Sequence, residues 1–144
     1  MSLPATAPSA KVLELERVMR EMPQVEMETR HHFAGGMYAR ELVQPAGTVV
    51  VGKVHKKEHF YIITKGRVRV VMDGMARDYE APAVIVSQPG TKRAIYAVTD
   101  AVYMTVHRTK KRNIERIERE LVEEDKLALF DAGNRLRPRA LEAP

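Results

Sequence analysis

The stretch "KVHKKEHFYIITKG", residues 53–66, contains two histidines four positions apart with a glutamate between them. As letters, "HKKEH" at residues 55–59 matches H-x-x-E-H, a zinc-peptidase signature that requires an α-helix. The flanking residues oppose a helix, because "GTVVVGKV" and "FYIITKG" are rich in β-branched and aromatic residues and contain glycines. The sequence therefore predicts two strands joined by a short turn and argues against a protease.

Side-chain alternation along these two strands predicts where the histidines point. In "VVVGKVH", His55 shares a face with Lys53, and after the turn His59 shares a face with Tyr61. If both faces look into one barrel, the two imidazoles converge in its interior.

Segments of similar composition continue on both sides of this stretch. "GTVVVGKV", "RVRVVM", "APAVIVSQPG", "KRAIYAVTD" and "AVYMTVHR" are dense in Val, Ile, Tyr and Thr, and Gly, Pro or Asp residues bound them. Short strands separated by turn signals are typical of an all-β sandwich or barrel. We expect the barrel to span residues 30–109.

The two ends of the chain have a different character. Residues 1–9 are rich in Pro, Ala and Ser and are expected to be disordered, and a helical arm is expected over residues 10–29, its helix ended by Pro23. A C-terminal helix is predicted at 110–132, followed by a flexible tail at 133–144. The apolar stripe of this helix must face the barrel or a second subunit, and it consists of Ile114, Ile117 and Leu121.

Composition limits the classes of partner and compartment. The 144 residues include no cysteine, so any metal must be held by His, Asp or Glu. No apolar run reaches the roughly 18 residues of a membrane helix, and no signal peptide is recognisable, so a cytoplasmic protein without membrane association is expected. The net charge is +5, but basic residues gather in "HRTKKR" and near the C-terminus, which makes nucleic-acid binding an unfavoured interpretation.

The spacing Gly47-x5-Lys53-x-His55-x3-His59-x6-Gly66 resembles the first motif of the cupin superfamily. The family pattern is glycine, five residues, His-x-His, three or four residues, glutamate, six residues, glycine. Two ligand positions differ, because Lys53 stands in place of the first histidine and His59 in place of the glutamate. Only His55 keeps the family's ligand.

A second stretch, "APAVIVSQPGTKRAIYA", is similar to the second cupin motif. Arg93 stands where that motif has its histidine ligand, and Ala97 replaces its asparagine. The resemblance covers about residues 34–107 and implies a cupin-type antiparallel β-barrel, a double-stranded β-helix, with a short helix at each end. It also implies a homodimer, the common cupin assembly. Several phrases further resemble small cupin-like proteins encoded in phage and prophage genomes.

The cupin resemblance implies a single divalent metal ion, with zinc, manganese, iron and nickel as candidates. His55 and His59 are the first predicted ligands. His107 is a candidate third ligand if the strand face that it shares with Tyr103 points inward. The opposite face of that strand carries Val102, Met104 and Val106 and is more apolar. If that face points inward, His107 lies outside the barrel. The tandem pair at residues 31–32 is a weaker candidate, which could lie over an opening of the barrel.

Two other uses of the barrel remain open from the sequence. Lys53 and Arg93, with Tyr61 beside His59, could form a metal-free pocket for a small anion such as a carboxylate, phosphate or sugar phosphate. Alternatively, the interior is simply packed, Arg93 pairs with Glu58 or Asp100 at the surface, and the protein serves assembly. Whether the protein is an enzyme is left undecided.

Overall fold

Two antiparallel sheets form the body of the protein in the computed structural model, which describes residues 10–72 and 74–138. Within these residues the elements, in chain order, are α1 (Ala10–Met19), β1 (Thr29–Ala34), β2 (Met37–Gln44), β3 (Val49–Val51), β4 (His59–Lys65), β5 (Arg67–Met72), β6 (Met75–Glu80), β7 (Ala83–Ser87), β8 (Ala94–Ala97), β9 (Ala101–Arg108) and α2 (Ile114–Leu121). The predicted disorder of residues 1–9 and the last six residues of the predicted tail lie outside the described residues.

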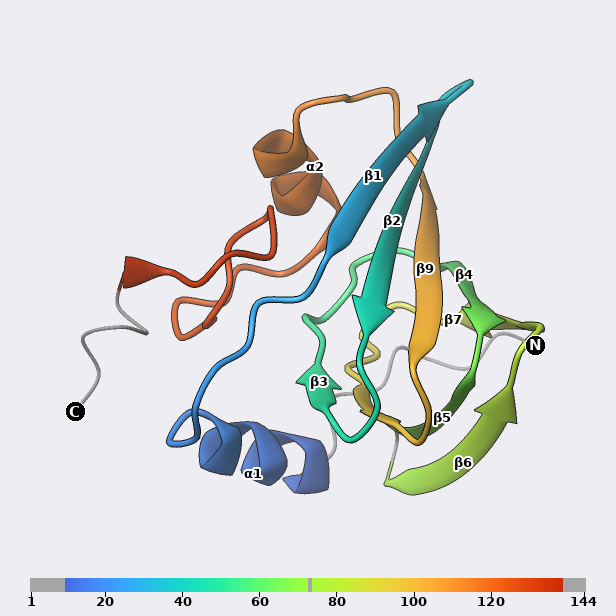
Figure 1. Ribbon diagram of the computed structural model, residues 1–144. Helices are drawn as coiled ribbons and strands as arrows, with labels where there is room; N and C mark the ends of the chain where they lie inside the picture. Colours follow the sequence, from blue (N-terminus) through green and yellow to red (C-terminus); the bar gives the residue numbers. More distant parts are fainter. Residues whose placement is uncertain (1–9, 73, 139–144) are drawn as a thin grey trace.

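The strand order shows how distant segments become neighbours. One sheet has the order β1-β2-β9-β4-β7 and the other β3-β8-β5-β6, and every strand pair is antiparallel. Figure 1 shows β2, β9 and β4 side by side, although β9 is near the end of the barrel sequence. This arrangement confirms the predicted antiparallel all-β fold.

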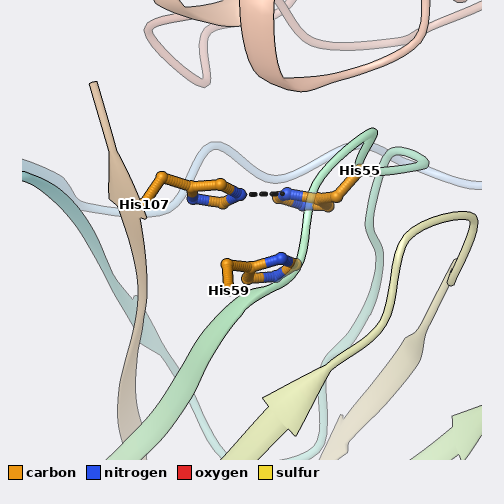
Figure 2. A group of neighbouring side chains, drawn as sticks. All are labelled: His55, His59 and His107. Atoms are coloured by element: carbon orange, nitrogen blue, oxygen red, sulfur yellow. Dashed lines mark hydrogen bonds between the residues drawn. The ribbon is translucent and has the colours of Figure 1, made fainter. Parts of the chain in front are cut away.

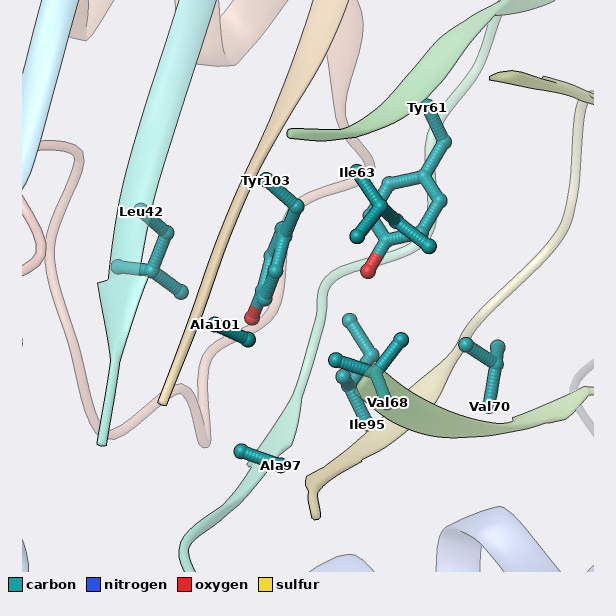
Figure 3. Packing of buried hydrophobic residues seen from close by; sticks show 9 residues of the cluster. All are labelled: Leu42, Tyr61, Ile63, Val68, Val70, Ile95, Ala97, Ala101 and Tyr103. Atoms are coloured by element: carbon teal, nitrogen blue, oxygen red, sulfur yellow. The ribbon is translucent and has the colours of Figure 1, made fainter. Parts of the chain in front are cut away.

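The hydrophobic core lies between the two sheets and follows the alternation of the strands (Figure 3). Along β4, for example, Tyr61 and Ile63 are fully buried whereas Phe60 is half exposed. The buried set is drawn from five strands and consists of Leu42, Tyr61, Ile63, Val68, Val70, Ile95, Ala97, Ala101 and Tyr103. Burial of each Val, Leu or Ile side chain in this set contributes about 1.5 to 3 kcal/mol.

A buried glutamine connects the sheets at one end of the core. Gln44 is fully buried, and its amide nitrogen donates to the carbonyl oxygens of Thr48 and Ile95 at 2.9 and 3.0 Å. The Tyr103 hydroxyl donates to the amide oxygen at 2.7 Å. Because a buried polar group is costly unless it is paired, these bonds are what permit a glutamine at this position.

The N-terminal helix ends earlier than Pro23, at Met19, and the chain then runs without regular structure to β1 at Thr29. The helix is attached to the barrel by an ion pair of 2.8 Å between Glu16 and the buried Lys92. The predicted helical arm therefore contains a helix only in its first half.

The C-terminal helix is likewise shorter than the predicted 110–132. It begins after Asn113, whose side chain accepts from the backbone N–H of Arg116, and it ends at Leu121 because Val122 adopts an extended conformation. Val122 instead pairs with His55 in an isolated β-bridge. The helix lies beside β1 (Figure 1).

The apolar stripe of α2 covers its own barrel. Ile117 and Leu121 are buried and form a second cluster with Tyr38 of β2. This stripe is thus occupied within one chain, and the homodimer stays a prediction. Among the described residues, none of the helices combines the length and apolar character needed to cross a bilayer.

Candidate metal centre

Three imidazoles converge at one end of the barrel (Figure 2). The register explains two of them: Phe60 of β4 pairs with Val106 of β9, so His59 and His107 follow as inward-facing neighbours on adjacent strands. His55 comes from the segment between β3 and β4. That segment is fixed by hydrogen bonds, because the His55 carbonyl oxygen accepts from the Gly90 N–H at 2.9 Å.

The distances between the three rings are short. Nδ1 of His55 and Nε2 of His107 are 3.0 Å apart and share a hydrogen bond. The ring centroids of His55 and His59 are 4.3 Å apart, and those of His59 and His107 are 4.1 Å apart. One nitrogen from each ring lies within 4.8 Å of the other two. His107 therefore joins the predicted pair, and its face of β9 points inward.

The tautomer of His59 follows from its partners. Its Nδ1 lies 2.9 Å from the Lys57 carbonyl oxygen, which can only accept, so Nδ1 carries the hydrogen. Its Nε2 lone pair is then free to accept, and it faces Nη2 of Arg93 at 3.4 Å. A carbonyl that orients a histidine in this way is the usual outer partner of a metal-binding imidazole.

Arg93 is buried beside this group rather than paired at the surface. Only 7% of the residue is exposed. Its Nη1 donates to the Ser87 hydroxyl, and its guanidinium carbon lies 4.3 Å from the ring centroid of Tyr61. The surface pairing with Glu58 or Asp100, considered from the sequence, does not form; among the described residues Arg93 has no carboxylate partner.

All three imidazoles are neutral at neutral pH. Burial, opposed by the hydrogen bond to the Lys57 carbonyl and assisted by the charge of Arg93, lowers the pKa of His59 to about 4. Burial, followed by the charges of His59 and Arg93, lowers the pKa of His107 to about 3. Burial also holds the pKa of His55 well below its usual range. Neutral imidazoles have the lone pairs that a metal ion requires.

We expect the free energy of unfolding of the metal-free protein to fall as the pH decreases from about 6.5 toward 4. Unfolded histidines titrate near 6.5, whereas the folded pKa values of His59 and His107 are about 4 and about 3. In that window the unfolded state binds more protons, so stability increases with pH by up to about 1.4 kcal/mol per unit for each group. Urea titrations with a chelator measure this slope. His107→Gln should flatten it, and an unchanged slope would contradict the assignment.

The other predicted residues lie in different environments. Nζ of Lys53 forms an ion pair of 2.7 Å with Glu118 of α2, so its charge is already matched. Nδ1 of His31 lies 2.6 Å from the Tyr38 hydroxyl, and His32 pairs with Glu41. Both histidines lie on β1, within the five-stranded sheet and not before the barrel, and their partners are side chains of β2. Tyr61 lies beneath Arg93, and its buried hydroxyl has no partner among the described residues.

A cavity of about 630 Å³ adjoins the histidines and is walled by both sheets and by α1, α2 and residues 127–132. His55, His107, Tyr61 and Arg93 line it. An interior with this much open space argues against the solidly packed barrel considered from the sequence.

Several solved structures have a fold similar to that of this chain. A cupin superfamily protein from Desulfitobacterium hafniense is 12% identical, with 62% of this chain and 84% of that chain covered and a TM-score of 0.51. The fold is that of the cupins. The cupin domain of Cnp3 from Schizosaccharomyces pombe is 16% identical over 62% of this chain and 68% of that chain, with a TM-score of 0.50. A predicted oxalate decarboxylase from Thermotoga maritima is 18% identical over 60% and 83%, with a TM-score of 0.51.

No family model matches the sequence, and no curated protein matches it either. At these identities the similarities show the cupin fold and nothing of the chemistry. The site must therefore be judged from its own donor atoms.

The donor set of this cupin barrel fits a divalent metal ion. Two nitrogens bound to one ion at about 2.1 Å lie about 3.0 to 3.4 Å apart, and Nδ1 of His55 and Nε2 of His107 are 3.0 Å apart. The buried Nδ1 of His107 has no partner among the described residues. The His55–His107 hydrogen must shift to another ring nitrogen before both atoms can bind, which neutral imidazoles permit by changing tautomer.

Sequence reasoning missed two polar residues near the site, Ser87 and Arg40. Ser87 is the last residue of β7 and pairs with His59 in the β4–β7 register. Arg40 lines the cavity from β2. Alternation along β2 was the available signal, because Arg40 lies two residues from the buried Tyr38 and Leu42.

Proposed function

We propose that His55, His59 and His107 bind one divalent metal ion, with zinc, manganese, iron and nickel as candidates, and that the adjoining cavity takes a small molecule. The convergence of three neutral imidazoles supports this proposal most directly. Three protein ligands leave further coordination positions for water or a bound molecule. A metal held there would act as a Lewis acid toward an oxygen of that molecule.

The protein's own residues would position the bound molecule. Arg93 offers a cation beside the histidines, and the Tyr61 hydroxyl offers an unused hydrogen-bonding group. The helices and the C-terminal segment that wall the cavity reduce the access of bulk water.

Metal analysis tests this proposal directly. Protein purified without an affinity tag, stripped with chelator and reloaded, should bind one ion per chain. Replacing both His55 and His59 with alanine should weaken binding by more than about 100-fold, because the loss of even an outer partner costs 10- to 100-fold.

The matched control changes two histidines that lie elsewhere. The His31→Ala, His32→Ala double variant should keep one ion per chain, because both residues belong to β1 and pair with Tyr38 and Glu41. Thermal melts of the metal-free proteins show whether each variant is folded. Equal metal binding by both double variants, or no binding by the wild type with any of the four metals, would refute the proposal.

A metal-free site for a small anion is the second candidate function. It is supported by one observation, the buried guanidinium of Arg93 without a carboxylate partner in the described part of the chain. The pairing of Lys53 with Glu118 leaves Arg93 as the anchor in this candidate. A wild type that binds none of the four metals would favour this function over the first.

A further inference from the structure

We infer that Arg93 makes metal binding depend on an anion: the three histidines bind a divalent ion tightly only when a small carboxylate occupies the Arg93 guanidinium. This inference rests on the metal site proposed above and adds both the class of ligand and the way in which the two bound species are linked.

Arg93 competes with a metal ion for one of its ligands. The hydrogen on Nδ1 of His59 is directed at the Lys57 carbonyl oxygen, so Nε2 is the nitrogen with a lone pair. That lone pair accepts from Nη2 of Arg93 at 3.4 Å. A guanidinium has donors and no acceptor, so this contact uses the electron pair that a metal would need.

The charge of Arg93 also opposes a cation at the histidines. Arginine stays protonated in proteins, so Arg93 cannot relieve the repulsion by losing a proton. Because the residue is 7% exposed, solvent screens it poorly, and a divalent ion bound to His59 would lie within a few ångströms of the guanidinium. An anion bound to Arg93 would offset the positive charge of the guanidinium and so remove its repulsion of the metal ion.

The protein does not supply that anion from the described residues. The carboxylates on the cavity wall already have partners: Glu118 pairs with Lys53, Glu16 with Arg20 and Lys92, Asp125 lies at 4.0 Å from Lys92, and Asp131 accepts from the N–H groups of its own turn. Two cationic side chains that line the cavity, Arg40 and Arg93, form no ion pair with any described residue. The cavity therefore lacks negative charge beside the histidines.

The way in which Arg93 is held favours a planar carboxylate. The ring of Tyr61 supports one face of the guanidinium, and Ser87 fixes Nη1. Of its five N–H groups, those not used by Ser87 and His59 remain for two parallel bonds to a carboxylate, the geometry that arginine prefers. The apolar side chains of Leu42 and Ile95 on the same wall suit the carbon part of such a ligand.

Calorimetric titration of the stripped, full-length protein with Zn²⁺ tests the inference. The titration is run in sodium acetate and, at equal ionic strength, in sodium perchlorate, whose anion binds metals and arginine weakly. We expect Zn²⁺ to bind about tenfold more tightly in acetate, a typical size for coupling between two sites. By reciprocity, acetate should bind about tenfold more tightly to the zinc-loaded protein.

Two variants identify Arg93 as the source of the coupling. Arg93→Met should bind Zn²⁺ more tightly than wild type in perchlorate and should show no acetate effect. Lys53→Met, the matched control that removes a cation paired with Glu118, should keep the acetate effect. If Arg93→Met fails to fold, Arg93→Lys replaces it. Lysine keeps the positive charge, so zinc binding in perchlorate should stay as weak as in the wild type. Most of the acetate effect should be lost, because lysine lacks the bidentate fork.

The possible outcomes separate the inference from the function on which it rests. Zinc binding of equal affinity in the two anions, or an acetate effect retained by the arginine variants, would overturn the coupling while leaving the metal site in place. No zinc binding in either anion would overturn the metal site itself, and the coupling with it.

Discussion

Gly66→Ala should lower the free energy of unfolding by more than about 3 kcal/mol, enough to leave much of the protein unfolded. Gly66 joins β4 to β5 with φ at +83°, a conformation that costs other residues about 1 to 2 kcal/mol. A Cβ there would overlap the carbonyl oxygen of Asp100 and approach the Thr99 hydroxyl at 2.7 Å. The carbonyl belongs to the backbone of the turn before β9, so the turn must move to admit a methyl group.

Gly47→Ala is the matched control for this substitution. Gly47 has nearly the same φ, +81°, but a Cβ there would meet nothing within 4 Å. Its cost should be limited to backbone strain of about 1 to 2 kcal/mol. Urea denaturation of both variants, followed by circular dichroism, measures the difference. Equal losses of stability in the two variants would mean that the close approach of Gly66 to the turn at Thr99 and Asp100 does not constrain the barrel.

Ile63→Ala should cost about 2 to 5 kcal/mol in the free energy of unfolding. Ile63 is fully buried between the sheets, so alanine leaves a cavity that the surrounding side chains of the core fill only in part. The same urea titration measures the loss. A cost this large is expected only on the inward face of β4.

The neighbouring Ile62 supplies a control with the same chemistry. Ile62 lies on the opposite face of β4, is partly exposed, and is paired across the sheet with Val84 and Met104. Ile62→Ala should cost clearly less than Ile63→Ala, because its outer face retains water contact and leaves no enclosed void. A larger loss at Ile62 would show that the faces of β4 are assigned the wrong way round.

The strands around residues 53–66 were predictable because their chemistry is local. β-Branched residues, alternation and bounding glycines all act over a few positions, and they correctly indicated β4, which carries His59, and a strand before it. The prediction that this earlier strand reaches His55 is wrong, because β3 ends at Val51, and His55 approaches His59 from the irregular segment that follows. The spacing between Gly47 and Gly66 carried the same information, since both glycines adopt positive φ at turns.

The inward orientation of His107 could not be decided from β9 alone. Its two faces are both rich in apolar residues, because the outer face of the larger sheet carries partly exposed side chains such as Val102, Met104 and Val106. Alternation tells which residues share a face, but choosing the inner face requires knowing which strands lie on each side. The pairing of β9 with β4 and β2 provides that answer.

Long-range polar partners were beyond the reach of the sequence for a similar reason. Lys53 and Glu118 are 65 positions apart, and nothing in either segment marks them as a pair. One interpretation of the sequence paired Arg93 with Glu58 or Asp100, whereas in the structure its guanidinium contacts Ser87 and His59. The early end of α2 at Leu121 is also a tertiary effect, because residues beyond it pair with the segment around His55.

The bridge between Val122 and His55 has a consequence for how the protein is made. The Lys56 N–H donates to the Leu121 carbonyl oxygen at 2.7 Å, and the Glu123 N–H donates to the Val54 carbonyl oxygen at 2.9 Å. His55 is thus held from one side by chain that leaves the ribosome some 65 residues later. During synthesis the barrel strands, with His59 and His107, are complete before this clasp exists. The nascent chain therefore completes the cluster of three histidines last, and binding of the proposed metal ion would fall at the end of folding.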